Sequence, residues 1–243
     1  MFHILFAVKE TNKQLSWLNR LLFLIGKPVK IHESPLHNTP WLTNSMIALI
    51  SVISIIAWMP DNMAFMFGNF AFYPQKDGFE WFTGLFSCAF LHGSWMHLIG
   101  NMYFFWLFGR HVECRFGRRR MLGLFFISTA LGSWLHGMFS DMPLVGASGG
   151  IFGLLTFYAM LFPKSRILWI PFIGAVLRFF ALQWAVLRKG MPVRVYVGIF
   201  LLFQLFLLYS QLFLDGNISA LGHLGGGFAG VIIYFAWKKG VIP

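Results

Sequence analysis

The sequence is poor in charged residues. Only 11% of its 243 residues are Asp, Glu, Lys or Arg, whereas 58% are hydrophobic. A typical soluble domain carries about 25% charged residues. The composition therefore excludes an ordinary soluble fold and, with apolar runs of about 20 residues, indicates a polytopic membrane protein. The net charge of +11 is spread over the segments between those runs, which argues against the single basic face of a nucleic-acid-binding protein.

Cysteine is scarce as well. Cys88 and Cys114 are too few for a disulfide framework or a metal cluster. The chain opens without the basic stretch of a cleaved signal peptide, so we expect none. We expect one membrane domain, 41–243, after a short cytoplasmic extension, 1–40. Apolar residues at near-helical spacing within 15–22 fit either a helix on the membrane surface or a small packed appendage.

Six apolar runs have the length and composition of membrane spans. They are 41–59, 94–109, 121–140, 148–162, 195–213 and 220–237. The connection 61–92 is rich in aromatic residues, which favours a place in the membrane interface. A further apolar stretch, 167–187, contains Pro171, Gly174 and Arg178, and we interpret it as interfacial or re-entrant. The expected fold is an all-α, six-transmembrane-helix bundle with an interfacial loop between helices 1 and 2.

Lysine and arginine are unevenly distributed among the loops. They gather in the segments 9–30, 110–120, 164–194 and 238–239. The other three loops hold Lys76 as their only basic residue, together with five acidic residues. The positive-inside rule then places both termini in the cytoplasm. We expect a multi-pass integral membrane protein, and we assign it to a bacterial inner (plasma) membrane.

One serine lies among glycines at the head of the fourth span. From Ser148 to Phe162, before Pro163, a helix rises roughly 22 Å at ~1.5 Å per residue. The hydrocarbon core is about 30 Å thick, so Ser148 should lie about 8 Å below the outer surface. Glycines on one face of this helix allow a neighbouring helix to approach closely, and its N-terminal N–H groups suit a developing oxyanion.

A buried serine needs a base before it can act as a nucleophile. The last span offers His223, its only residue that titrates near neutral pH. Gly226 and Gly230 follow it and form a second stripe for close packing. The fourth and sixth spans can then touch and bring the imidazole to the hydroxyl of Ser148. This requires the two helices to run in the same direction, which also argues against counting 167–187 as a span.

Further polar groups occupy the second span. His97 and Asn101 are four residues apart, so they share one helical face in the outer half, and both can donate hydrogen bonds to an oxyanion. No carboxylate lies inside any span, so the pattern favours a Ser–His dyad over a triad. A histidine metal site would need carboxylate or cysteine partners at this depth, so we expect no metal. Three histidines near span ends receive no role: His92, His111 and His136.

Each of these groups has an ordinary explanation when taken alone. The serine can bond back to its own helix, and the histidines and the asparagine can join helices as polar contacts. Their common depth favours a catalytic site. The stretch Gly146–Gly150 also resembles the nucleophile elbow of soluble hydrolases, but that turn needs a preceding strand and an acid. The sequence supplies neither.

Together the motifs resemble the rhomboid family of intramembrane serine proteases. The resemblance covers nearly everything from the second span onward. It rests on Gly146-x-Ser148-Gly149, on His223 with Gly226 and Gly230, on His97-x-x-x-Asn101, on Phe90–Ser94 and on Gly109-x-x-x-Glu113. Two features depart from the family. Phe82 follows Trp81 where many members carry Trp-Arg, and residues 164–192 are longer than a typical link to the fifth helix.

The resemblance implies a six-helix core with Ser148 as nucleophile and His223 as general base. It implies that His97, Asn101 and the Ser148 backbone N–H bind the oxyanion, and that Phe152 stacks on His223. Gly146, Gly149, Gly226 and Gly230 would support the site. The family cleaves membrane-anchored proteins within or beside their transmembrane segments, without a metal or cofactor, and the fifth helix is its usual substrate gate.

The expected partners are therefore membrane protein substrates and the lipid bilayer, and no nucleic acid. Two other functions remain open from the residues. An inactive relative would bind membrane proteins without cutting them. A small transporter would need polar groups along the full depth of several helices, whereas here these groups cluster at one level.

Overall fold

The computed structural model describes residues 29–32, 36, 38–168, 190–214 and 218–242. The chain separates into two compact units. One comprises residues 1–35 and 162–199, and the other comprises residues 36–161 and 200–243. Of the segments interpreted above, 15–22 and 169–187 lie outside the described residues.

The first unit contains a small antiparallel sheet. Its strands are β1 (Val29–His32), β2 (Arg166–Leu168) and β3 (Met191–Pro192), in the order β1-β2-β3. The side chain of Arg166 donates a hydrogen bond to the Gly190 carbonyl at 2.8 Å. These strands were not predicted from the sequence. The start of the stretch interpreted as interfacial or re-entrant, residues 167 and 168, belongs to β2.

The other unit is helical, and each predicted span contains a helix. The helices among the described residues are α3 (Trp41–Ala57), α4 (Pro60–Phe70), α5 (Gly78–Ser87), α6 (Trp95–Phe104), α7 (Arg110–Phe116), α8 (Arg118–Gly137), α9 (Ser148–Leu161), α12 (Val193–Phe213) and α13 (Ala220–Lys238). A 3-10 turn, η1 (Cys88–Phe90), follows α5, and a π-helical turn, η2 (Phe105–Gly109), joins α6 to α7. Helix α12 begins in the first unit and continues into the second.

Two of the described helices, α12 and α13, are long and apolar enough to cross a membrane. The number rises to three if α3 and α4, which meet at a bend of 117°, form one broken span. Helix α9 is apolar but shorter. The fold is thus mostly helical, with two or three candidate spans.

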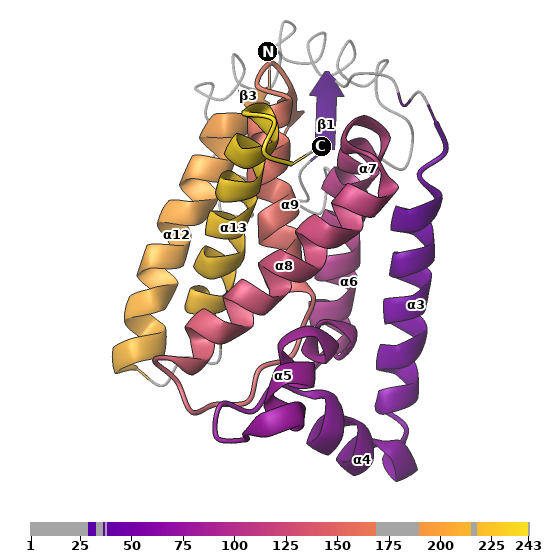
Figure 1. The fold of residues 1–243 in the computed structure, drawn as a ribbon, viewed down its shortest axis with the longest axis vertical. Helices are drawn as coiled ribbons and strands as arrows, with labels where there is room; N and C mark the ends of the chain where they lie inside the picture. Colours follow the sequence, from indigo (N-terminus) through magenta and orange to yellow (C-terminus); the bar gives the residue numbers. More distant parts are fainter. Residues whose placement is uncertain (1–28, 33–35, 37, 169–189, 215–217, 243) are drawn as a thin grey trace, which may run out of the picture. The chain divides into compact units, whose positions relative to one another are not determined.

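Helices α8, α9 and α13 lie side by side (Figure 1) and touch through glycine. A Cβ added to Gly226 would overlap the carbonyl oxygen of Gly149, and one added to Gly230 would overlap that of Gly153. From the first contact to the second, the residue number rises by four in both helices. Helices α9 and α13 therefore run in the same direction, as the sequence predicts. Gly132 of α8 lies equally close to the α13 backbone. Only glycine permits backbones to approach this closely.

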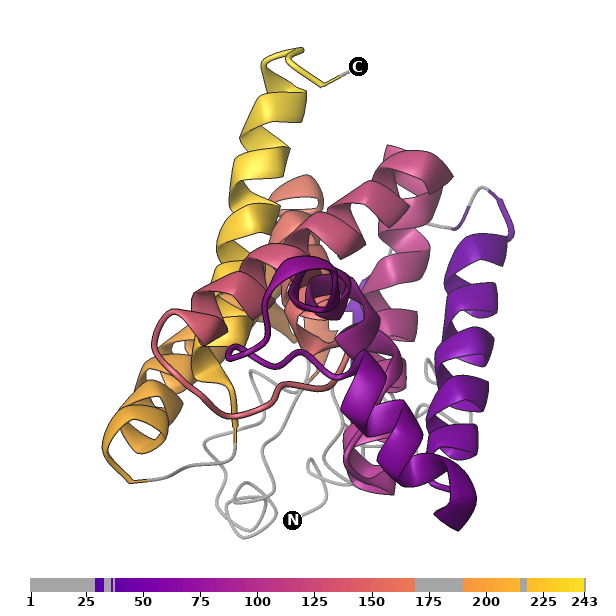
Figure 2. The same cartoon turned by 60° about the horizontal axis from the view of Figure 1, so that its bottom comes forward.

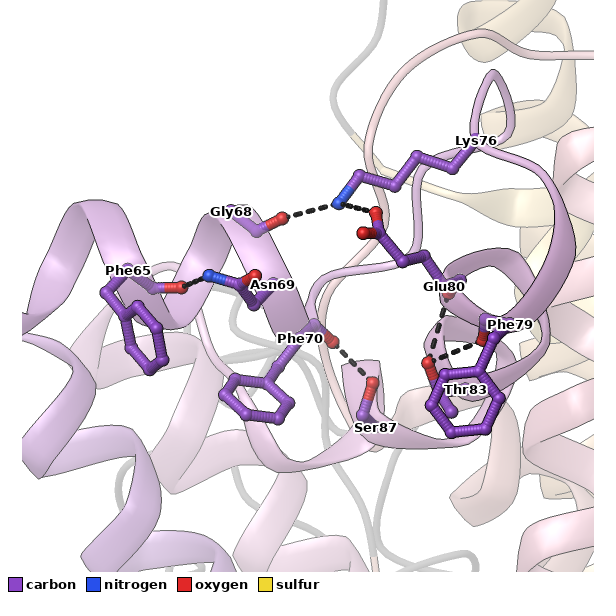
Figure 3. A network of polar contacts seen from close by, with 9 residues as sticks. All are labelled: Phe65, Gly68, Asn69, Phe70, Lys76, Phe79, Glu80, Thr83 and Ser87. Carbon is purple, nitrogen blue, oxygen red and sulfur yellow. Dashed lines mark hydrogen bonds and ion pairs between the residues drawn. The ribbon is translucent and has the colours of Figure 1, made fainter.

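The connection 61–92 folds into α4, α5 and η1. Figure 2 shows α4 and α5 at the same end of the unit as the segment between α8 and α9, to which Phe72 is joined by a backbone bridge with Leu144. Figure 3 shows how α4 and α5 are tied together. Lys76 donates to the Gly68 carbonyl and pairs with Glu80, each at 2.8 Å, and Ser87 donates to the Phe70 carbonyl at 2.7 Å.

These bonds bear on one departure from the family pattern. Phe82 stands where many members carry arginine, and it offers no hydrogen bond donor to the loop. The Lys76 ammonium instead joins the last turns of α4 to the first turn of α5. The connection therefore has its own structural tie. Its place in the membrane interface stays a prediction.

The carboxylate of Glu113 caps the first turn of α3. It accepts hydrogen bonds from the backbone N–H groups of Leu42 (3.0 Å) and Thr43 (2.7 Å) and from the Thr43 hydroxyl (2.7 Å). Pro40 precedes this helix and supplies no side-chain cap. The first N–H groups of a helix have no partner within the helix, and a carboxylate there is favourable to the helix dipole. The motif Gly109-x-x-x-Glu113 thus connects α7 to α3.

Candidate active site

The glycine before Ser148 has a conformation and a position that require it. Gly146 has φ +120°, a region that side chains disfavour. A Cβ at this position would also come within 2.7 Å of the His97 ring. Its N–H donates to the Cys88 carbonyl at 2.9 Å. The turn that leads into α9 is therefore held against α6 and η1, and Ser148 begins the helix.

The structure brings His223 and Ser148 together. The Nε2 atom of His223 lies 2.9 Å from the Oγ atom of Ser148. Phe152, one turn after the serine, lies flat against the imidazole, with ring centroids 4.4 Å apart and an interplanar angle of 6°. The stack limits rotation of the ring, and the distance suits proton transfer from a hydroxyl to an imidazole.

The other ring nitrogen of His223 also has a partner. Its Nδ1 atom lies 2.7 Å from the Oε1 atom of Gln204 on α12, and Gln204 is only 2% exposed. Gln204 was not predicted as a site residue, because only a carboxylate was considered as a partner for the base. A signal was present, since an amide within an apolar run needs a hydrogen bond partner.

The two predicted oxyanion donors lie on α6. The hydroxyl of Ser94 caps this helix by accepting a hydrogen bond from the His97 backbone N–H at 3.2 Å. The His97 ring lies against Gly146, as does the Nδ2 atom of Asn101, which would be 3.7 Å from an added Cβ there. This Nδ2 atom is buried and has no hydrogen bond partner among the described residues. It is a donor free to bind a group at the start of α9.

His92, which had no predicted role, supports the same turn. Its Nδ1 atom lies 3.0 Å from the Ser54 hydroxyl, which donates to the Phe90 carbonyl, and its Nε2 atom accepts from the Ala147 N–H at 3.4 Å. The hydroxyl hydrogen is used by Phe90, so Nδ1 carries the ring hydrogen and Nε2 is the acceptor. His92 thus links α3 to the residue before Ser148.

His136, on α8, supports the start of α13 in a similar way. Its Nε2 atom lies 2.8 Å from the Met142 carbonyl, and its Nδ1 atom lies 2.8 Å from the Ser219 hydroxyl. Ser219 caps α13 by accepting from the Gly222 N–H at 3.0 Å. Ser54, Ala147 and Ser219 are distant in sequence from the histidines that they contact, so these contacts could not be predicted from the position of a histidine near a span end. The third such histidine, His111, is buried in α7.

The chain is similar to known proteins. A rhomboid domain matches residues 79–239, which is more than half of the chain. Rhomboid-like protease 3 of Toxoplasma gondii is 24% identical over 202 residues, which cover 82% of this chain and 68% of that protein. The rhomboid proteases GlpG of Yersinia pestis (strain Pestoides F) and Yersinia pseudotuberculosis serotype O:3 (strain YPIII) are 29% identical over 119 residues, 47% of this chain.

The match to the Yersinia proteins spans 41% of their length. The domain match, in contrast, contains every predicted site residue, from His97 to Gly230. It also contains the motif that ends in Glu113. The protein therefore belongs to the rhomboid family.

Proposed function

We propose that this protein is an intramembrane serine endopeptidase that cleaves membrane protein substrates in or near their membrane segments. Ser148 is the nucleophile and His223 is the general base. The observation that carries the proposal is the 2.9 Å contact between Oγ and Nε2, made by an imidazole that Phe152 holds in plane. The rhomboid domain match supports it.

The reaction proceeds through an acyl-enzyme. The Oγ atom of Ser148 attacks the carbonyl carbon of the scissile peptide bond, while its proton moves to Nε2 of His223. His97, Asn101 and the Ser148 backbone N–H donate to the oxyanion. The imidazolium then gives its proton to the leaving amine, and the C–N bond breaks. A water molecule, deprotonated by His223, attacks the ester, and the proton returns to Ser148 as the acid product leaves.

The proposed topology has six spans in residues 41–243, with both termini and the extension 1–40 in the cytoplasm. The common direction of α9 and α13 supports it, because a single span between them gives that direction. The length of α9 supports the depth of the site. Its 14 residues rise about 21 Å, less than the hydrocarbon core of about 30 Å.

The test uses purified protein in liposomes with a substrate that contains a transmembrane segment. Ser148→Ala should reduce cleavage to background and abolish labelling by a serine-directed covalent probe. His223→Ala should also remove both signals, because the hydroxyl then has no base. Ser128→Ala is the matched control. Ser128 is another buried serine, on α8, and its Oγ has no partner among the described residues, so its loss should leave cleavage and labelling unchanged.

Two results would contradict the proposal. If Ser148→Ala cleaves as fast as the parent, the mechanism is wrong. If the parent protein binds the substrate but neither cleaves it nor reacts with the probe, the protein is a binding member of the family rather than an enzyme.

A further inference from the structure

One amide is buried in α12 where the surrounding helix is apolar. Between Phe200 and Phe213 the exposed side chains of this helix include Leu202, Phe203, Leu205 and Phe206, whereas Gln204 is 2% exposed. Burial of an amide without hydrogen bonds destabilises a protein. Gln204 avoids this destabilisation by bonding at both ends. Its Nε2 atom donates to the Phe200 carbonyl at 3.4 Å, and its Oε1 atom faces His223 at 2.7 Å.

These two bonds determine where the hydrogen of the imidazole lies. The Phe200 carbonyl can only accept, so the NH₂ group of Gln204 faces it and the Oε1 atom faces His223. Because Oε1 carries no hydrogen, the Nδ1 atom of His223 must be the donor. A neutral imidazole protonated on Nδ1 has a free lone pair on Nε2. That lone pair faces the Ser148 hydroxyl at 2.9 Å.

From this geometry we infer that Gln204 is a positioning residue of the reaction. It selects the tautomer of His223 that can accept the serine proton, and it holds the ring in the plane that points Nε2 at Oγ. The site is then a Ser148–His223–Gln204 arrangement rather than a dyad. The inference rests on the proposed function.

The chemistry of the third group fits its surroundings. A carboxylate would stabilise the imidazolium more strongly, because hydrogen bonds to ionised groups are about twice as strong as neutral ones. A carboxylate inside a membrane bundle, however, carries a large desolvation cost. The amide oxygen supplies direction and tautomer selection without a buried charge. When the proton reaches Nε2, the bond from Nδ1 to Oε1 becomes charge-assisted, so it strengthens as the reaction proceeds.

A purely structural role, in which Gln204 only fastens α12 to α13, is the competing explanation. Other contacts already provide that attachment. The Leu221 N–H of α13 donates to the Oε1 atom of Gln211 on α12 at 3.2 Å, and the Leu201 side chain lies 3.6 Å from the place of a Cβ on Gly227. Gln204 adds a directed contact to the ring that reacts. Ser148 and His223 stand on α9 and α13, whereas Gln204 stands on α12. The orientation of the base therefore depends on the position of α12 as well.

Three variants separate the two roles. Gln204→Met keeps the size and the unbranched shape of the side chain but removes the acceptor oxygen. Gln204→Glu keeps an acceptor oxygen at the same reach. Leu205→Met introduces the same residue at the next position, which is exposed, and controls for methionine in this part of α12.

The first measurement is steady-state cleavage in liposomes. Gln204→Met should lower kcat about tenfold with KM unchanged, which corresponds to about 1.4 kcal/mol. Gln204→Glu should recover at least half of the lost rate, and Leu205→Met should match the parent. If Gln204→Met stays within twofold of Leu205→Met, or if Gln204→Met and Gln204→Glu lose rate and melting temperature equally, the inference is wrong.

The second measurement does not depend on cleavage. Nitrogen-15 NMR of histidine-labelled protein in detergent, with the His223 signals assigned by their loss in His223→Gln, reports which ring nitrogen carries the hydrogen. The parent and Leu205→Met should show the Nδ1–H tautomer, and Gln204→Met should show a mixture of both. A parent with hydrogen on Nε2 overturns the inference. A parent that shows Nδ1–H but does not cleave supports the role of Gln204 in orienting the ring, while it contradicts the proposed function.

Discussion

The imidazole of His223 is held on two sides that differ in construction. On the side of Ser148, α13 meets α9 backbone to backbone, because glycines at 226 and 230 face glycines at 149 and 153. On the side of Gln204, the described contacts of α12 with α13 are made by α12 side chains. Gln204 bonds to His223, Gln211 accepts from the Leu221 N–H, and Leu201 lies against Gly227. Backbone contact leaves no freedom for adjustment, whereas side chains can change rotamer. Ser148 and His223 therefore stand on a rigid frame, which is the glycine contact between α9 and α13. Gln204 stands on α12, whose contacts with this frame can adjust.

Adjacent glycines of α13 give the largest contrast. Gly226→Ala places a Cβ on the Gly149 carbonyl oxygen, so α9 and α13 must separate. We expect cleavage to fall at least about 100-fold, since a misplacement of about 1 Å has that effect, and the melting temperature to drop because overpacking destabilises by about 1–3 kcal/mol.

Its matched control is Gly227→Ala. An added Cβ there meets only side chains, at 3.3 Å from Thr156 of α9 and 3.6 Å from Leu201 of α12. A shift of a few tenths of an ångström accommodates it, so the losses of cleavage and melting temperature should be much smaller than those of Gly226→Ala. Proteolysis in liposomes and thermal unfolding in detergent measure both variants. Equal effects of the two substitutions would break the distinction between a rigid and an adjustable side.

Phe152 belongs to the rigid frame and touches the base directly. Phe152→Leu removes the stack on His223, and aromatic pairs contribute about 0.5–1.5 kcal/mol beyond their buried area. We expect kcat to fall about tenfold. Steady-state cleavage measures the rate, and the melting temperature reports any general loss of packing. A fall in stability with an unchanged kcat would show that the stack supports the fold and not the base.

A smaller effect is expected one ring further from the imidazole. Phe200 stacks on Phe152 at 5.3 Å and on Phe104 of α6 at 5.6 Å. Phe200→Leu should lower kcat about two- to threefold, corresponding to about 0.5 kcal/mol, because neighbouring side chains can close on the space. The same cleavage assay checks it. A loss as large as that of Phe152→Leu would mean that α12 belongs to the rigid frame.

The parts of the fold predicted from sequence depend on local pattern. Apolar runs located six of the described helices to within a few residues: α3, α6, α8, α9, α12 and α13. They did not predict α4, α5 or α7. Glycines spaced by four predicted the contact of α9 and α13, and the single span counted between these helices predicted their common direction. The serine and the histidine that meet across that contact were selected by residue type and depth. Such features follow from periodicity within one helix, which a single sequence contains.

The parts that were not predicted depend on tertiary pairing. Strands β1 and β2 pair residues far apart in the chain, and each strand is too short to show a period. His92 finds Ser54 and His136 finds Ser219 only once the helices are packed. Gln204 was overlooked for a chemical reason, because an amide was not considered as a partner for the base. The functional roles of all these residues stay predictions until the variants are measured.

The cap on α3 has a consequence for how the chain is assembled. Thr43 and Glu113 are 70 residues apart, and a chain is synthesised from its N-terminus. The first predicted span therefore leaves the ribosome with its leading N–H groups unpaired, and their partner is added only after α4, α5 and α6 have been made. Until then water must satisfy those groups. The first turn of α3 is therefore capped only after α7 has been made. We expect the helices from α3 to α7 to assemble in one step instead of several.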